Sequence, residues 1–209
     1  MLVVLAKACV PGRVKTRLTP PLTPEEAARL AAVSLGATLA LARAVPAERH
    51  VLCFDGAAPD DADGFEVIPQ TDGPLDERIA AVFDRETSRT LLIGMDTPQA
   101  DPAVLARALS DGSGADAWFG PAADGGFWAL GMEHPRGDLV RGVRMSEPDT
   151  GRRQLRRLEV AGLTVETLPE LTDVDDIGTA RQVAALLPGS AFASALAAVD
   201  VRVPDAVGA

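Results

Sequence analysis

Short apolar runs alternate with longer stretches of helical character along most of the chain. The runs lie at residues 2–6, 50–54, 65–69, 90–94, 115–120, 127–132 and 163–168. Short runs that are apolar at successive positions are typical of buried strands in a parallel sheet that helices cover. Their alternation with helical segments therefore predicts an α/β fold with a mostly parallel central sheet flanked by helices.

Capping residues mark the helix boundaries. Thr23, Pro24 and Glu26 form the pattern of an N-cap, a first-turn proline and a capping-box acid, ahead of an alanine- and leucine-rich helix that ends at Pro46. Further helices are expected at residues 102–109, at residues 149–162 with a stop at Gly162, and after Asp176, which is the simplest N-cap among three aspartates.

The length and composition fit one globular domain. Of the 209 residues, 47% are hydrophobic and only 4% aromatic, so the core must consist of Ala, Val and Leu. We expect the domain to span residues 1–199 and residues 200–209 to form a flexible tail, because the end of the chain has no periodic pattern. Cys9 and Cys53 lie outside any CxxC pair and are expected to be free thiols.

The net charge limits the classes of partner. At −10 the surface as a whole repels nucleic acid and anionic membranes. No signal-peptide core is visible, and no apolar run approaches the roughly 18 residues of a membrane span. We therefore expect a cytoplasmic protein, a monomer or homodimer, with small-molecule partners and neither nucleic acid nor membrane among them.

A basic loop directly follows the first predicted strand, and its positive charge contrasts with the negative net charge of the chain. Ligands of parallel sheets bind outside the carboxyl ends of the strands, so this loop faces the expected cleft. Its Pro-Gly turn allows close backbone approach, and its cations can neutralise a di- or triphosphate, although the spacing is not that of a Walker loop. The alternative is a solvated basic loop. The nucleotide-binding candidates are Lys7, Gly12, Arg13, Lys15, Thr16 and Arg17.

Three aspartates are candidates for a metal site. Asp96 follows the strand at 90–94 and is placed to hold Mg²⁺ (or Mn²⁺) against phosphate oxygens, or merely to cap a turn before Pro98. Asp173 and Asp175 would repel each other unless a cation lies beside them. This cost favours a metal role for the pair.

The stretch "GPAADGGFWALGM" at residues 120–132 contains a turn signal. Asp124, Gly125 and Gly126 are typical of a hairpin turn between two strands. The glycines would also let the turn approach an acceptor, with Asp124 hydrogen-bonding it. Both interpretations stay open. No G-x-S-x-G elbow supports a hydrolytic triad.

Four motifs in order, "KACVPGRVKTRL", "GMDTP", "GPAADGGFWALGM" and "LPELTDVDD", resemble a small bacterial glycosyltransferase-like family encoded near radical-SAM and selenium- or arsenic-related enzymes. That family has the nucleotide-diphospho-sugar transferase (GT-A) fold, and the resemblance spans roughly residues 1 to 187. The first and last motifs are also similar to phospholactate and phosphoenolpyruvate guanylyltransferases, in which a lysine-arginine loop meets the triphosphate and separated aspartates hold Mg²⁺.

The resemblance implies specific roles. Lys15 and Arg17 would bind phosphate, and Asp96 with Asp173 or Asp175 would bind the metal. The chain departs from the family at Cys9, where proline is usual, at Thr97, where cysteine is usual, and at Phe127, where tyrosine is common. "RMSEP" replaces a tryptophan-serine-threonine stretch that is typical of the family, so the acceptor side around Met145, Ser146 and Glu147 differs from the family pattern. "DDIGT" replaces a threonine-proline-acid helix start.

The sequence thus favours a Mg²⁺-dependent transferase that acts on a nucleotide-activated substrate. The charge of the basic loop suits nucleotidyl transfer from an NTP to a small phosphorylated or acidic acceptor, because a triphosphate carries more negative charge to neutralise than the diphosphate of a sugar donor. The family resemblance favours glycosyl transfer from a nucleotide sugar. A non-catalytic nucleotide-binding module is the third alternative. Lys15, Asp96 and Asp124 are the catalytic candidates, and Asp124, Gly125, Gly126 and Ser146 the acceptor-binding ones.

Overall fold

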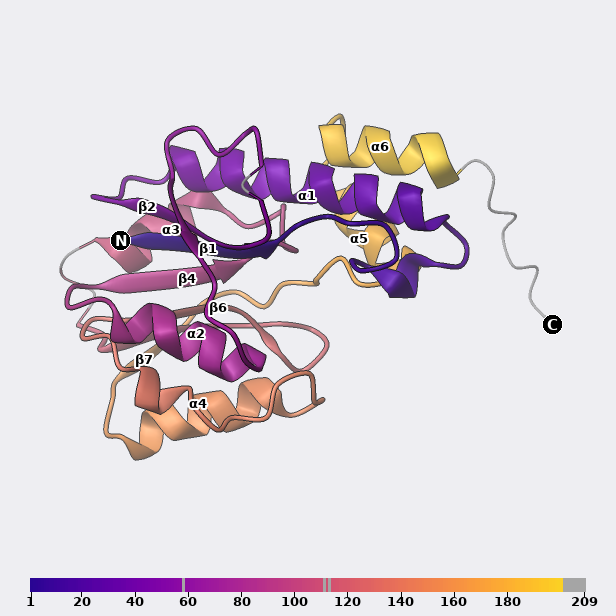
Figure 1. The fold of residues 1–209 in the computed structure, drawn as a ribbon. Helices are drawn as coiled ribbons and strands as arrows, with labels where there is room; N and C mark the ends of the chain where they lie inside the picture. The colour runs from indigo at the N-terminus through magenta and orange to yellow at the C-terminus, as the bar shows by residue number, and fades with distance from the viewer. Residues whose placement is uncertain (58, 111, 113, 201–209) are drawn as a thin grey trace.

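The computed structural model describes residues 1–200 except 58, 111 and 113. A seven-stranded sheet in the order β3-β2-β1-β4-β6-β5-β7 forms its centre, with β6 antiparallel to its neighbours and the other pairings parallel (Figure 1). The predicted α/β class is confirmed. The strands are β1 (Leu2–Lys7), β2 (His50–Asp55), β3 (Glu66–Pro69), β4 (Thr90–Gly94), β5 (Ala117–Pro121), β6 (Phe127–Met132) and β7 (Val165–Thr167).

Helices cover both faces of the sheet, which explains why the strands are apolar at successive positions. Leu2 and Val4 of β1 belong to the core that α1 and α3 complete, whereas Val3 points into the core beneath α2 and α4. A smaller core joins α5 and α6 to the start of α1. The helices are η1 (Thr16–Leu18), α1 (Pro24–Ala44), α2 (Leu75–Asp84), α3 (Pro102–Leu109), η2 (Gly137–Leu139), α4 (Thr150–Val160), α5 (Ile177–Leu186) and α6 (Ala191–Asp200).

The predicted caps are present. At the start of α1, the Thr23 hydroxyl accepts from the backbone N–H of Glu26, and the Glu26 carboxylate accepts from that of Thr23. Asp176 caps α5 in the same way with Thr179. Cys9 and Cys53 are free. Of the tail expected at 200–209, residues 201–209 lie outside the described residues.

Helix α1 corrects one expectation, that no segment has the length and apolarity of a membrane span. By length and composition alone this helix does, and half of its most apolar stretch is buried within the fold. Its buried side packs against the sheet and α6 (Figure 1), as in the core helix of an α/β domain.

The topology gathers six connecting segments at one edge of the sheet. β1, β2, β3 and β4 run parallel, so their carboxyl ends share that edge. Because β6 is antiparallel to both β4 and β5, the β5–β6 turn emerges there as well. The segment after β7 arrives at the same edge, because β7 runs parallel to β5. The loops that carry the predicted site residues are therefore neighbours.

Candidate active site

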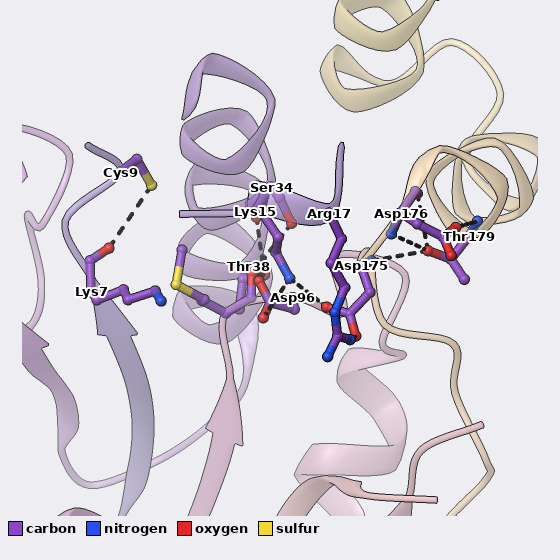
Figure 2. A network of polar contacts seen from close by, with 11 residues as sticks. Lys7, Cys9, Lys15, Arg17, Ser34, Thr38, Asp96, Asp175, Asp176 and Thr179 are labelled. Carbon is purple, nitrogen blue, oxygen red and sulfur yellow. Dashed lines mark hydrogen bonds and ion pairs between the residues drawn. The ribbon is translucent and has the colours of Figure 1, made fainter. Parts of the chain in front are cut away.

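Lys15 lies between two of the aspartates that the sequence assigns to a metal. Its Nζ is 2.8 Å from Asp96 Oδ2 and 3.1 Å from Asp175 Oδ1 (Figure 2). Burial alone would lower the pKa of the Lys15 ammonium, but the charges and hydrogen bonds of the two aspartates outweigh it and raise that pKa. The Lys15 side chain is only 7% exposed, so its ammonium is shielded from solvent, whereas the side chains of Asp96 and Asp175 are 32% and 31% exposed.

Arg17 extends the same network from the surface. Its Nη1 is 3.5 Å from Asp175 Oδ2, and its side chain is 75% exposed. Lys7 at the end of β1 and Thr16 at the start of η1 are also exposed. The basic loop therefore offers one buried cation, Lys15, and three cations that face solvent, Lys7, Arg13 and Arg17.

Hydrogen bonds from other elements fix the two acidic loops. The hydroxyls of Ser34 and Thr38 in α1 each donate to the carbonyl of Met95 at 3.3 Å, directly before Asp96 (Figure 2). The backbone N–H of Val174 donates to the Asp96 carbonyl at 3.1 Å. This bond joins the loop after β4 to the segment before α5, so it fixes the positions of residues around Asp96 and Val174 relative to each other.

Asp173 has the most perturbed environment among the aspartates. Burial raises the pKa of its carboxyl to about 7, and the like charges of Asp96, Asp124 and Asp175 add to this effect, while the Lys15 ammonium opposes it. Its Oδ1 is buried without a hydrogen-bond partner, and so is Asp96 Oδ1. The carboxylates therefore have more capacity to bind cations than the single ammonium of Lys15 satisfies.

Such orphaned oxygens suit a hard divalent cation, which prefers carboxylate ligands and retains several waters. The donor set of Asp96, Asp173 and Asp175 thus fits Mg²⁺ or Mn²⁺ chemically. Among the described residues, no three His, Cys, Asp or Glu side chains are arranged as a ready-made metal cluster. A cation at this place would therefore need the carboxylates to rearrange around it or additional ligands from a substrate.

The β5–β6 hairpin confirms the predicted turn, and its glycines are constrained by packing. Asp124 Oδ1 accepts from the backbone N–H of Gly126 at 2.8 Å, which closes the turn. Gly125 has φ +89°, and a Cβ there would lie 2.0 Å from the carbonyl oxygen of Pro148. A Cβ on Gly151 would lie 2.3 Å from the Gly126 carbonyl oxygen. The turn is thus packed tightly against the start of α4.

Three cavities line the loop edge of the sheet and share residues with one another. The loop cavity, of about 340 Å³, lies at the basic loop, and the turn cavity, of about 260 Å³, lies at the β5–β6 turn. The Arg78 cavity, of about 410 Å³, lies beside α2. Asp96 and Leu75 line all three. The three cavities therefore form one continuous cleft.

The structure brings most predicted site residues to this cleft. Those lining the loop cavity are Lys7, Lys15, Thr16, Arg17, Asp96, Ser146 and Asp175, and those lining the turn cavity include Asp96, Asp124, Gly126, Ser146 and Asp173. Gly12 and Arg13 are exposed and absent from the lining of all three cavities. Gly12 adopts φ +73°, as its turn requires.

Sequence reasoning missed the residues that α2 and the end of β3 supply. Gln70 Nε2 donates to the carbonyls of Ala6 and Cys53, at 2.7 and 3.2 Å, and Arg78 donates to Gln70 Oε1 at 3.1 Å and to Asp55 Oδ2 at 2.7 Å. Both side chains line the Arg78 cavity. The signal was present, since acids follow Pro74 and apolar residues recur at helical spacing through residues 75–84.

Solved structures of bacterial proteins share this fold. A protein of Desulfovibrio desulfuricans G20, provisionally named a nucleotide-diphospho-sugar transferase, is 25% identical with a TM-score of 0.82, over 96% of this chain and 95% of that one. The manganese complex of Rv0371c from Mycobacterium tuberculosis H37Rv is 25% identical with a TM-score of 0.51, over 87% and 96% of the chains.

A third structure shares the fold alone. CMP:2-keto-3-deoxy-manno-octonic acid synthetase in complex with CTP is 13% identical with a TM-score of 0.53, over 90% of this chain and 97% of that one. This likeness adds to the evidence for the fold, whereas the likeness to the Desulfovibrio protein shows both a nucleotide-diphospho-sugar transferase fold and an enzyme of the transferase class.

No curated protein matches the sequence. A family model described as "Uncharacterized protein conserved in bacteria (DUF2064)" matches residues 36–147, more than half of the chain. The protein therefore belongs to the DUF2064 family.

Proposed function

We propose that the protein is a cytoplasmic transferase that depends on Mg²⁺ or Mn²⁺ and transfers a nucleotidyl group from an NTP to a small phosphorylated or acidic acceptor. One observation carries the proposal: a basic loop and a set of carboxylates with orphaned oxygens line the same continuous cleft. Cations suit the phosphates of a donor, and the carboxylates suit the divalent ion that accompanies such phosphates.

The donor phosphates would occupy the loop cavity. Lys7 and Arg17 face this cavity with exposed cationic groups, and Thr16 adds a hydroxyl. Lys15 supplies a further positive charge, from a flexible stem that can follow the phosphates. Positive charge at this place stabilises the pyrophosphate leaving group as negative charge develops on it.

Asp96, with Asp173 or Asp175, would hold the divalent cation. When bound, such an ion neutralises charge on phosphate oxygens and orients them for displacement. The solved manganese complex of the Mycobacterium tuberculosis protein supports the use of a divalent metal on this fold.

The acceptor would occupy the turn cavity. Asp124 and Ser146 line it together with Asp96, and Gly126 exposes backbone there. Ser146 adopts φ 60°, an unusual conformation for a residue with a side chain, in the loop that lines this cavity. One carboxylate oxygen of Asp124 accepts the hydrogen bond that closes the turn. The other oxygen would accept a hydrogen bond from a hydroxyl of the acceptor substrate.

Glycosyl transfer from a nucleotide sugar is the second candidate. It is favoured by the name of the Desulfovibrio desulfuricans protein, which shares 25% identity and nearly the whole fold. The two chemistries differ in the leaving group, because nucleotidyl transfer releases pyrophosphate and glycosyl transfer releases a nucleoside diphosphate or monophosphate.

A thermal-shift panel of NTPs and nucleotide sugars, with and without Mg²⁺ or Mn²⁺, tests the proposal. A ligand at a hundred times its dissociation constant adds roughly 2.7 kcal/mol of stability. We expect stabilisation by one NTP that requires the metal. Stabilisation by nucleotide sugars alone would favour the second candidate, and no stabilisation by any nucleotide would contradict both.

A further inference from the structure

The Lys15 ammonium occupies the oxygen atoms that a metal ion would need. It contacts Asp96 Oδ2 and Asp175 Oδ1 at 2.8 and 3.1 Å (Figure 2), and the Lys15 side chain itself is nearly buried. A lysine ammonium and a divalent cation prefer the same carboxylate partners, and they cannot occupy the same space. Lys15 is therefore a potential competitor of the metal.

The lysine is an incomplete partner for these carboxylates. Asp96 Oδ1 and Asp173 Oδ1 stay buried without a hydrogen bond while Lys15 is in place. One ammonium carries a single charge and three donors, whereas a divalent ion carries twice the charge and binds six or more oxygens. A divalent ion can thus displace Lys15, at the cost of losing two ion pairs.

The displaced ammonium has a second set of partners within reach. Lys15 lines the loop cavity together with the exposed cations Lys7 and Arg17. Among the described residues, Asp96 and Asp175 are the acids that line this cavity, and Arg17 already pairs with Asp175. An anion bound there would attract the released ammonium, because its charge is no longer neutralised by the aspartates. Metal binding and anion binding would then support each other.

We propose that Lys15 is an internal cation that competes with the divalent metal: it pairs with Asp96 and Asp175 until the metal takes these carboxylates, and it then binds the anionic group that arrives in the loop cavity. The metal and the anion rest on the proposed function. The exchange breaks and forms ion pairs only, with no covalent step. It makes metal affinity low without an anion and high with one.

Calorimetric titration of Mn²⁺ into the wild-type protein and the Lys15→Met variant tests this exchange, first without and then with pyrophosphate as the anion. Without pyrophosphate, we expect the variant to bind Mn²⁺ roughly 5- to 150-fold more tightly, the range typical of coupled binding events. Pyrophosphate should raise the Mn²⁺ affinity of the wild type by a larger factor than that of the variant, in which only the direct contacts between the anion and the metal remain.

Lys7→Met is the matched control. Lys7 is the only other lysine of the chain, and it lines the same cavity. Its removal changes the net charge by the same amount and leaves the ion pairs of Lys15 with Asp96 and Asp175 in place. In the titration without pyrophosphate, we expect at most a threefold change in Mn²⁺ affinity, roughly the effect of one exposed charge. An equal gain in both variants would overturn the specific role of Lys15.

Stability gives a second measurement that protects the test against a folding defect. Lys15→Met takes from Asp96 its ion-pair partner and leaves Asp175 with the exposed Arg17 only, so its Tm without metal should fall and Mn²⁺ should restore it by more than it stabilises the wild type. Lys15→Gln keeps a hydrogen-bond donor without the charge. Its Tm without metal should also fall, and Mn²⁺ should also restore it, but both changes should be smaller than in Lys15→Met. Mn²⁺ affinity in both Lys15 variants equal to or weaker than wild type, including no binding at all, overturns the inference. Metal-dependent nucleotide binding in the thermal-shift panel would leave the transferase proposal standing in that case.

Discussion

Replacing Asp173 with asparagine should stabilise the protein at alkaline pH in the absence of metal. The Asp173 carboxyl is buried, one of its oxygens has no hydrogen-bond partner, and three other carboxylates lie around it. The fold therefore holds a proton on this carboxyl more tightly than the unfolded chain does. Asparagine removes the charge at nearly the same size and shape.

The magnitude follows from the pKa of Asp173, which burial and the like charges raise from 3.8 to about 7. Because the folded pKa is raised, the contribution of this group to stability is fully present below about pH 4 and is lost as the pH rises to about 7. At roughly 1.4 kcal/mol per pKa unit, the wild type loses on the order of 4 kcal/mol by about pH 8. The loss is about half a kcal/mol at about pH 4.

Chemical denaturation with EDTA at about pH 4 and about pH 8 measures this difference. The Asp173→Asn variant should exceed the wild type by about 4 kcal/mol at the higher pH, or roughly 8–16 °C in Tm for a domain of this size. Glu159→Gln, an exposed acid on α4, is the control and should stay within about 0.5 kcal/mol of wild type at both pH values. Equal stability of Asp173→Asn and wild type at about pH 8 would refute the reasoning.

Three further predictions concern the turn, the first helix and the loop. Gly125→Ala should lower the free energy of unfolding in urea by about 2–4 kcal/mol, because a Cβ there meets the Pro148 carbonyl. Gly162 has a similar φ but open space around it, so Gly162→Ala should lower the same free energy by only about 1 kcal/mol. Thr23→Ala removes a capping-box hydroxyl and should lower the free energy of unfolding by about 1 kcal/mol, with unchanged nucleotide affinity in calorimetry. Arg17→Ala should weaken nucleotide binding by about 1.5–3 kcal/mol and leave the Tm within about 2 °C, since its side chain is largely exposed; unchanged affinity would exclude a phosphate contact.

The sequence predicted the architecture well because local signals determine it. All seven expected strands are present, and the caps at Thr23 and Asp176 start helices as their side-chain chemistry requires. Helices α2 and α6 were missed, although residues 75–84 carry a helical pattern. The antiparallel direction of β6 was indicated only by the turn at Asp124, because a strand buried on both faces has the same pattern in either direction.

The site was predictable as a set of residues but not as an arrangement. The loop position of Lys15 and the strand-end position of Asp96 follow from the order of elements. That the Lys15 ammonium pairs with Asp96 and Asp175 depends on contacts across the fold, which no local pattern contains. The same holds for Asp173, whose burial without a partner distinguishes it from its neighbour Asp175.

The central claim is that one cleft binds a nucleotide donor and a divalent cation together. Calorimetric titration of the NTP selected by the thermal-shift panel, with Mn²⁺ and with EDTA, tests it most directly when repeated on Asp96→Asn. The account predicts that Mn²⁺ raises the nucleotide affinity of the wild type roughly 5- to 150-fold and that Asp96→Asn loses most of this gain. Nucleotide affinity that is the same with and without Mn²⁺, or coupling that persists in Asp96→Asn, would contradict it.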